Sequence, residues 1–414
     1  MTGEAFRQLG FAGPTVFPLG LGCMAKPVFT LEALEAKHGD SLLLHYGTLA
    51  NPKLIVIDGG PGGVFKTTLE PRLKEIHANR GSAILEIRLL MVSHIDDDHI
   101  TGIVQLAKEL RDLQDQHATL PYDILTLWHN SFDDIVGAAG PTVAALLRAA
   151  AFSPRTADGA AIVASVPQGR QLRLDADKLA INMNSGFDDL IRFEPAAPKS
   201  LKISADLTFR VLGPRQPELD RLEAKWHKDV AAFLAKKKKK KKKAGGGSEA
   251  SLTGAELETL AAEFVDDSVH NLSSLVVLAE LDGKRMLLTG DARGDFILDS
   301  LRDAGLIKNG KCAIDILKVP HHGSVRNTAP VFFKTIVADH YVFSANGRDG
   351  NPDPATFDLL FNARPSGTYH LWLTNNVATA VNHIAQNKPS SVKVHIRKDA
   401  DRSVRVELGA PITW

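Results

Sequence analysis

Two histidines and three aspartates fall within six residues of one stretch of the sequence, LLMVSHIDDDHITG, at residues 89–102. From His94 to His99 their spacing is H-x-D-x-D-H, with Asp96 and Asp98 as the second and third members. Carboxylates this close repel one another unless a cation holds them. Capping of a helix would account for one or two of the aspartates but not for the flanking histidines. The stretch therefore predicts a metal site.

Two further clusters follow apolar segments later in the chain. Asp291 ends the segment LLTGDA, where a buried carboxylate is costly without a partner. His321 and His322 come directly after an apolar run in KVPHHGS, and histidines in such places serve as metal ligands or proton-transfer groups. Each cluster alone also fits a structural role, a Gly-Asp turn or a local histidine contact. Together with the first stretch they favour one shared metal centre.

The elements between these clusters alternate between strands and helices. We expect a hairpin over residues 40–60 that ends in the turn Asp58-Gly59-Gly60, and a second hairpin over 273–291 around Asp282-Gly283. A strand is expected over 86–94, followed by an amphipathic helix over 101–116. Further strands are expected at 122–130, 206–214, 314–320, 340–346, 369–375 and 392–399, and helices at 67–79, 295–306 and 355–363. The repeated order of strand, polar cluster and helix places the clusters on one edge of a sheet system.

Composition sets the class of protein. The chain has 414 residues, of which 44% are hydrophobic and 23% charged, which is typical of a globular protein with one large or two medium domains. Its two cysteines, Cys23 and Cys312, are far apart and suggest neither a disulfide framework nor a thiolate zinc site. The apolar N-terminal stretch is interrupted by Pro14 and Pro18, so we expect no signal peptide, no membrane span and a cytoplasmic location.

The formal net charge of +1 hides an uneven distribution, because eight consecutive lysines occupy Lys236 to Lys243. Such a run repels itself, and the Gly-rich segment that follows extends it into a linker at 236–248. Two interpretations stay open: a solvated linker, or a tether for nucleic acid or another anionic surface.

Taken as a set, the motifs resemble the metallo-β-lactamase superfamily and, in detail, the hydrolase domain of ComEC-type competence proteins. The shared motifs are Gly39-Asp40-Ser41, Asp58-Gly59-Gly60, NLSSLVVL, LLTGDA and VPHHGS. The resemblance covers roughly residues 35 to 375. It implies an α/β fold, the four-layered αβ/βα sandwich of that superfamily, as a single domain over residues 1–414 with insertions near 130–200 and 214–270.

The resemblance also implies roles for individual residues. One metal ion would be held by His94 and Asp96, the other by Asp98 and His99, and Asp291 would bridge them. One histidine of the pair His321 and His322 would complete the second site, with His322 favoured as the ligand and His321 left to assist catalysis. Asp98 would also orient the nucleophile. Asp58 either steadies the attacking water or forms the turn.

Some positions depart from the family pattern. Asp96 stands where the wider superfamily has a histidine, and no histidine follows FRVLGP, where a third zinc ligand is usual. The resemblance implies two divalent ions, zinc or manganese, and the oxygen ligands favour harder ions such as Mn²⁺ or Mg²⁺ over Zn²⁺ relative to an all-imidazole site. His129 could supply the missing ligand or could be a locally bonded residue at a strand end. Asn351 in GNPDP replaces a histidine of GHPxP, which would alter a substrate contact.

The activity implied by the resemblance is hydrolysis of phosphodiesters in DNA by a water molecule that two metal ions activate. No base-reading motif is visible, so we expect little sequence preference. Two alternatives remain: hydrolysis of a small ester or phosphoester, and a catalytically impaired component of a multi-protein system with protein partners.

Overall fold

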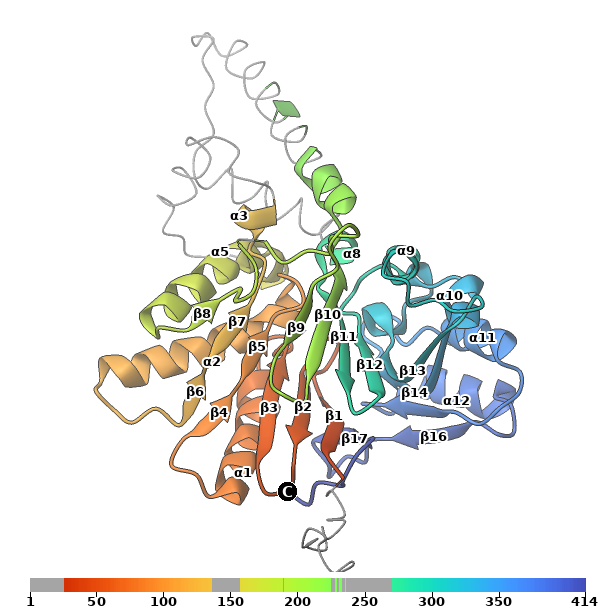
Figure 1. The fold of residues 1–414 in the computed structure, drawn as a ribbon, viewed down its shortest axis with the longest axis horizontal. Coiled ribbons are helices and arrows are strands. Elements are labelled where there is room, and N and C mark those ends of the chain that lie inside the picture. The colour runs from red at the N-terminus through yellow and green to blue at the C-terminus, as the bar shows by residue number, and fades with distance from the viewer. Residues whose placement is uncertain are drawn as a thin grey trace, which may run out of the picture.

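The computed structural model describes most of the chain, and its core is built on two large mixed β-sheets that lie against each other (Figure 1). The described residues are 26–135, 157–188, 190–224 and 270–414, together with 228, 231, 232 and 235. Cys23, the lysine tract and most of the predicted insertion at 214–270 lie outside them. Among the helices in these ranges, none combines the length and apolar character needed to cross a membrane.

The first sheet has seven strands. Its order is β17 (Ser403–Glu407), β1 (Val28–Leu34), β2 (Leu42–Gly47), β3 (Pro52–Ile57), β5 (Leu89–Met91), β7 (Thr126–Trp128) and β8 (Asn182–Met183). Neighbours are antiparallel from β17 to β3 and parallel from β3 to β8. The parallel strands are rich in buried Leu, Ile and Val, as is usual when both faces of a sheet are covered.

The second sheet has eight strands. Its order is β16 (Lys393–Ile396), β15 (His370–Leu373), β14 (Ile336–Phe343), β13 (Cys312–Lys318), β12 (Lys284–Leu288), β11 (Val276–Leu281), β10 (Thr208–Gly213) and β9 (Ser200–Lys202). Neighbours are parallel from β12 to β16 and antiparallel from β9 to β12. A separate parallel pair joins β4 (Leu85–Ile87) to β6 (Tyr122–Ile124).

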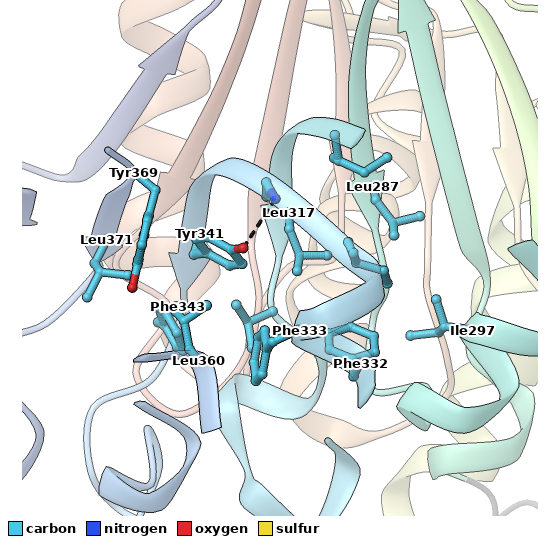
Figure 2. Close-up of a cluster of buried hydrophobic side chains, with 14 of the residues drawn as sticks. Leu287, Ile297, Leu317, Phe332, Phe333, Tyr341, Phe343, Leu360, Tyr369 and Leu371 are labelled. Carbon is cyan, nitrogen blue, oxygen red and sulfur yellow. Dashed lines mark hydrogen bonds between the residues drawn. The ribbon is translucent and has the colours of Figure 1, made fainter. Parts of the chain in front are cut away.

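Helices cover the outer faces of both sheets (Figure 1). The longer helices are α1 (Glu70–Arg80), α2 (Asp97–Asp115) and α5 (Ala157–Lys178) beside the first sheet, and α9 (Gly294–Asp303), α10 (Pro330–Thr335), α11 (Pro354–Ala363) and α12 (Ala378–Asn387) beside the second. One core fills the space between the sheets, and each helical layer has its own core. Figure 2 shows Phe332 and Phe333 of α10 packed against Leu317, Tyr341 and Phe343 of the second sheet. Burial of such aromatic side chains stabilises this layer.

The structure confirms both predicted hairpins, β2–β3 and β11–β12, and the predicted strands of the second sheet. It divides two predicted strands, because residues 85–87 and 89–91 pair with different partners, as do 122–124 and 126–128. The predicted helix at 101–116 begins earlier, at Asp97. Strands β1 and β17 were not anticipated, nor was α12.

The parallel pairings bring distant loops to one edge of the molecule. The carboxyl ends of neighbouring parallel strands lie at the same edge, so the segments after β3 and β5 meet in the first sheet and those after β12, β13 and β14 meet in the second. These segments carry the predicted site residues. The single-domain arrangement over the whole chain remains a prediction.

Candidate metal centre

The loop between β5 and α2 holds the first cluster of ionisable residues. Asp96 is the N-cap residue of α2, so Asp98 and His99 occupy the first turn, where the helix dipole favours negative charge. Two glycines allow neighbouring loops to approach this turn closely. A Cβ atom on Gly39 would lie 1.9 Å from the backbone oxygen of Asp98, and one on Gly102 would lie 2.0 Å from that of Gly59. The first turn of α2 therefore packs closely against the segments that follow β1 and β3.

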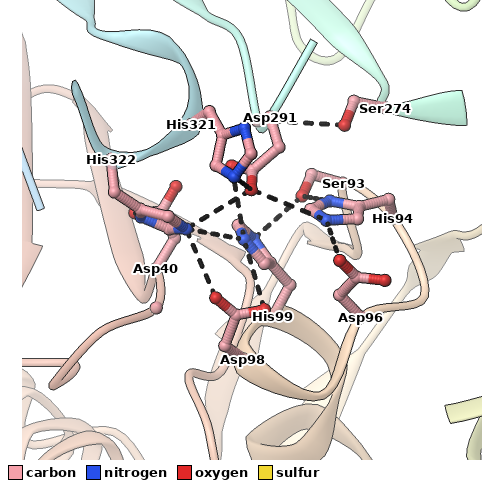
Figure 3. Close-up of polar contacts among 12 residues, drawn as sticks. Asp40, Ser93, His94, Asp96, Asp98, His99, Ser274, Asp291, His321 and His322 are labelled. Carbon is pink, nitrogen blue, oxygen red and sulfur yellow. Dashed lines mark hydrogen bonds and ion pairs between the residues drawn. The ribbon is translucent and has the colours of Figure 1, made fainter. Parts of the chain in front are cut away.

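The loops after β12 and β13 bring the other two clusters to the same place (Figure 3). Nε2 of His322 lies 3.3 Å from Oδ2 of Asp98, 3.3 Å from Nε2 of His99 and 3.4 Å from Oδ2 of Asp291. On the other side of the site, Nε2 of His94 lies 3.2 Å from Oδ2 of Asp96. All three sequence clusters thus converge.

Protein groups fix the ring orientation of two of the histidines through their Nδ1 atoms. His99 Nδ1 lies 2.8 Å from Oδ2 of Asp58, and His322 Nδ1 lies 2.9 Å from the backbone oxygen of Ser344. Because both partners are acceptors, we assign the proton to Nδ1 in each ring. This tautomer leaves the Nε2 lone pair free for a metal ion, an arrangement common around metal-binding histidines.

The other two histidines follow the same pattern. His94 Nδ1 lies 3.0 Å from Oγ of Ser93, whose hydroxyl itself donates to Asp58, and His321 Nδ1 lies 2.8 Å from Oδ1 of Asn327. The four Nε2 atoms then converge on the carboxylate of Asp291, at 3.9 Å from His94, 3.4 Å from His99, 3.8 Å from His321 and 3.4 Å from His322. Asp291 is the shared member of the site.

Burial and crowding of charge perturb the titration of these groups. Burial acts against ionisation of Asp98, but His99 and His322 outweigh it and lower its pKa to about 2. Asp291 is likewise held well below its usual pKa by His322 and His99, despite its burial. Burial also opposes the charged form of both histidines, yet the surrounding carboxylates raise the pKa of each well above its usual value. Burial, reinforced by His99, lowers the pKa of His94 to about 4.

A buried ion pair supports the site from behind. Lys318, at the end of β13, is fully buried, and its Nζ lies 2.7 Å from Oδ2 of Asp40. Oδ1 of Asp40 lies 3.4 Å from Nδ1 of His322. Sequence reasoning used Asp40 only as part of a motif and missed Lys318. The signal was a lysine between Leu317 and Val319 in an apolar strand, because a buried ammonium requires a counter-ion.

The donor set suits a metal ion. Asp40, His99, Asp291 and His322 are all buried, and each offers a ligand atom within 4.8 Å of the others, so this group could hold a cation. Oδ1 of Asp291 is buried and receives no hydrogen bond from the described groups. A buried carboxylate oxygen without a donor, surrounded by imidazole nitrogens, is better satisfied by a divalent ion than by protein groups alone.

The structure brings all the predicted ligands together. The two neighbouring histidines, His321 and His322, differ in how deeply they are buried at the site. His322 lies inside the site with 5% of its side chain exposed, whereas His321 is 30% exposed and its Nε2 approaches the site carboxylates only at Asp291. Both have positive φ angles, 48° and 55°, in a region that non-glycine residues rarely occupy. Such a conformation at a site is typical of a functional constraint on the backbone.

His129 is placed beside the site but not among its ligand atoms. It follows β7, next to β5 in the sheet, and is buried against Gly169 of α5, whose Cβ position would lie 3.2 Å from its Nε2. Burial lowers its pKa to about 4. Asn351 lies in the segment that packs against the turn at His321–Gly323, where Pro352 contacts Gly323.

No family model and no curated protein matches this chain.

Proposed function

We propose that the protein is a metal-dependent hydrolase that cleaves phosphodiesters, built on the four-layered αβ/βα metallo-β-lactamase sandwich. One observation carries the proposal: four histidine Nε2 atoms from two separate segments converge on one buried aspartate, Asp291, which comes from a third. The arrangement of helices outside and two sheets inside, with the site at one sheet edge, supports the fold assignment.

We assign two ion positions to the site. Asp98, His99, His322 and Asp291 would hold one ion, and His94, Asp96 and Asp291 the other. Asp40 is left out of the ligand set because it approaches His322 from its Nδ1 side, whereas the Nε2 side faces the other ligands. Asp40 is also already paired with Lys318. We therefore expect Asp40 to orient His322 rather than to bind an ion.

Two divalent ions supply charge for an in-line displacement at phosphorus and make water a stronger nucleophile at neutral pH. The protein groups do the remaining work. Asp98 would orient the attacking water, and His321, whose side chain is 30% exposed, would reach the substrate. Nδ1 of His321 donates to Asn327, so Nε2 is the nitrogen that faces the site, and in the imidazolium form it would give a proton to the leaving oxygen. The mix of carboxylate and imidazole favours manganese or zinc.

DNA is the substrate we favour, on the strength of the sequence resemblance and the lysine tract. The alternatives are a small ester or phosphoester and a protein without turnover that acts within a larger assembly. Hydrolysis of DNA and hydrolysis of a small phosphoester would use the same site chemistry. Substrate preference must therefore come from residues around the centre.

The test is to strip the purified protein of metal, restore Mn²⁺, Zn²⁺ or Mg²⁺ separately, and offer plasmid, single-stranded DNA, RNA and bis-p-nitrophenyl phosphate. Cleavage of the polymers supports the nuclease proposal, and cleavage of the small reporter alone supports the second function. Counting bound ions per chain by mass spectrometry tests the two-ion assignment independently of turnover.

Two variants provide the matched comparison. Asp291→Asn should abolish hydrolysis and reduce the number of bound ions, because it removes the shared carboxylate. Asp339→Asn, which changes an exposed aspartate of β14, should leave both unchanged. Bound metal with no hydrolysis of any substrate would overturn the enzymatic proposal. It would favour a protein without turnover that acts within a larger assembly.

A further inference from the structure

A histidine and an arginine from opposite ends of the chain form a pair beside the candidate metal centre. His38 lies in the turn between β1 and β2, and Arg348 lies in the loop after β14. The guanidinium NH1 of Arg348 donates a hydrogen bond to Nε2 of His38 over 2.8 Å, although 310 residues separate them. Neither residue belongs to the ligand set or to the motifs that predicted it.

The turn that carries His38 is fixed against one of the ligand residues. The backbone N–H of Asp40 donates to the backbone oxygen of Asp98 over 3.2 Å, and Gly39 allows the two segments to touch. Burial lowers the pKa of His38, and the nearby Asp98 carboxylate acts in the opposite direction. His38 therefore lies within electrostatic range of Asp98.

The loop that carries Arg348 is fixed against a second ligand residue. Ser344 accepts the Nδ1 hydrogen bond of His322 on its backbone oxygen, and its hydroxyl donates to the backbone oxygen of Gly39 over 2.7 Å. One serine thus ties together both loops and His322. The pair of His38 and Arg348 consequently stands on the Asp98–His322 side of the centre.

Arg348 is exposed, and its guanidinium forms no ion pair with a carboxylate among the described residues. Many other arginines are paired in that way, as Arg302 is with Asp299. A guanidinium that is held by a neutral acceptor keeps its positive charge available and loses little freedom when it binds an anion. Its planar donors suit the oxygens of a phosphate group.

We propose that Arg348 binds the substrate phosphate next to the one that is cleaved, with His38 as the positioning residue that presents the guanidinium. The contact is assigned to the neighbouring phosphate because Arg348 reaches none of the site carboxylates and so lies outside the ions they would hold. The inference rests on the proposed phosphodiesterase function and narrows it to substrates with at least two phosphates. Such a contact would be made by a nucleic-acid polymer but not by a small phosphoester with one phosphate.

Binding tests the proposal without turnover. Fluorescence anisotropy of a labelled single-stranded oligonucleotide is measured with metal-stripped protein in EDTA. Arg348→Gln should weaken binding about tenfold, the size expected for a lost charged hydrogen-bonding contact. The matched control, Arg302→Gln, changes an arginine on α9 whose side chain is 64% exposed, and should leave binding unchanged. Equal weakening by both variants, or by neither, would overturn the assignment.

Kinetics with manganese-loaded protein separate this inference from the proposed function. Arg348→Gln should raise KM for the oligonucleotide with little change in kcat, and should leave hydrolysis of bis-p-nitrophenyl phosphate unchanged because that reporter has one phosphate. Loss of reporter hydrolysis in this variant would contradict the proposed contact. If the wild-type protein hydrolyses neither substrate, the proposed function fails, and the anisotropy result still decides whether Arg348 binds phosphate.

The role of His38 has its own readout. His38→Gln keeps a hydrogen-bond acceptor and should retain most of the oligonucleotide affinity, whereas His38→Phe should lose about as much as Arg348→Gln. The double variant His38→Phe with Arg348→Gln should be no weaker than Arg348→Gln alone, since His38 acts through the arginine. Additive losses would mean that His38 does not position Arg348.

Discussion

Two groups of buried charges in this protein differ in how they are neutralised. In the first sheet, Glu32 accepts hydrogen bonds from Arg72 at 2.8 and 3.1 Å and from Ser403 at 2.6 Å, and lies 2.9 Å from Nε2 of His45. At the candidate metal centre, four carboxylates lie close together: Asp40, Asp58, Asp98 and Asp291. Among the described residues, Lys318 is the only lysine or arginine that pairs with any of these four.

The difference shows what each group is built to hold. The Glu32 group is complete within the protein, and Arg72 extends it to the backbone oxygen of Trp414, so it joins the C-terminal segment to the sheet. At the candidate metal centre, Asp98 and Asp291 face imidazole groups rather than a lysine or arginine. Without a metal ion, protons on His99 and His322 offset part of this negative charge, and a divalent ion can take the place of those protons. The first group therefore serves stability, and we expect the second to serve cation binding.

The largest expected effect is on activity. His322→Ala should abolish hydrolysis of bis-p-nitrophenyl phosphate, because it removes the nitrogen that faces Asp98, His99 and Asp291. His321→Ala should leave measurable activity, since His321 is 30% exposed and is not in the proposed ligand set. Full activity in His322→Ala would break the comparison by showing that the convergent residues are not the catalytic centre.

The next largest expected effect is on the stability of the protein, through the buried charges around Glu32. Glu32→Gln should lower the free energy of unfolding by about 3–5 kcal/mol, because it removes the buried counter-charge of Arg72 and leaves only the exposed Glu75. Glu75→Gln removes a partner of the same arginine that is 45% exposed, and should cost less than about 1 kcal/mol. Urea denaturation measures both. Activity per folded molecule should be unchanged, and equal losses would show that burial does not distinguish the two carboxylates.

Metal removal should lower Tm through the candidate metal centre and not through the Glu32 group. A cation at 100 times its dissociation constant stabilises a folded protein by about 2.7 kcal/mol, so EDTA should lower Tm and Mn²⁺ should restore it. Asp291→Asn should lose this metal-dependent shift, and Glu75→Gln should keep it. A metal-dependent shift that survives in Asp291→Asn would place the ion elsewhere in the protein.

Asp58 tests the role of the residues behind the ligands. It contacts Nδ1 of His99, on the side of the ring away from the proposed ions. Asp58→Asn should weaken metal affinity about 10–100-fold, the usual cost of losing the partner that orients a ligating histidine. Isothermal titration with Mn²⁺ measures the change. Unaltered affinity would favour a role for Asp58 in shaping the turn.

The smallest effect is the acid dependence of the Glu32 group. Burial opposes ionisation of Glu32, but His45 and Arg72 outweigh it and lower its pKa to about 2, below the ordinary value of 4.5. Its contribution to stability is therefore complete above about pH 4.5 and is lost as the pH falls toward 2. One proton changes stability by at most about 1.4 kcal/mol per pH unit. Urea denaturation at pH 5 and 3.5 should show a shallower fall for Glu32→Gln than for the wild type.

Local patterns were enough to predict much of the fold. The hairpins at β2–β3 and β11–β12 carry alternating or continuous apolar runs that end in Asp-Gly turns, and both formed as expected. The divided strands at 85–91 and 122–128 could not be seen, because an apolar run does not reveal when its halves pair with different partners. Strand β17 depends on pairing with β1, as in the pair Thr30 and Glu407, which lie at nearly opposite ends of the described chain.

The same limit applies to the site. The residue types and spacing in HIDDDH, TGD and PHHG were sufficient to nominate candidate ligands, because clustered carboxylates and imidazoles have few other uses: His94, Asp96, Asp98, His99, Asp291 and one histidine of the pair His321 and His322. Which histidine faces the centre, the pairing of Asp40 with Lys318, and the meeting of His38 with Arg348 were decided only by the tertiary structure. Chemistry is carried by single residues and is visible in a sequence. Proximity is created when parallel strands bring the ends of remote segments to one edge, and no local pattern records it.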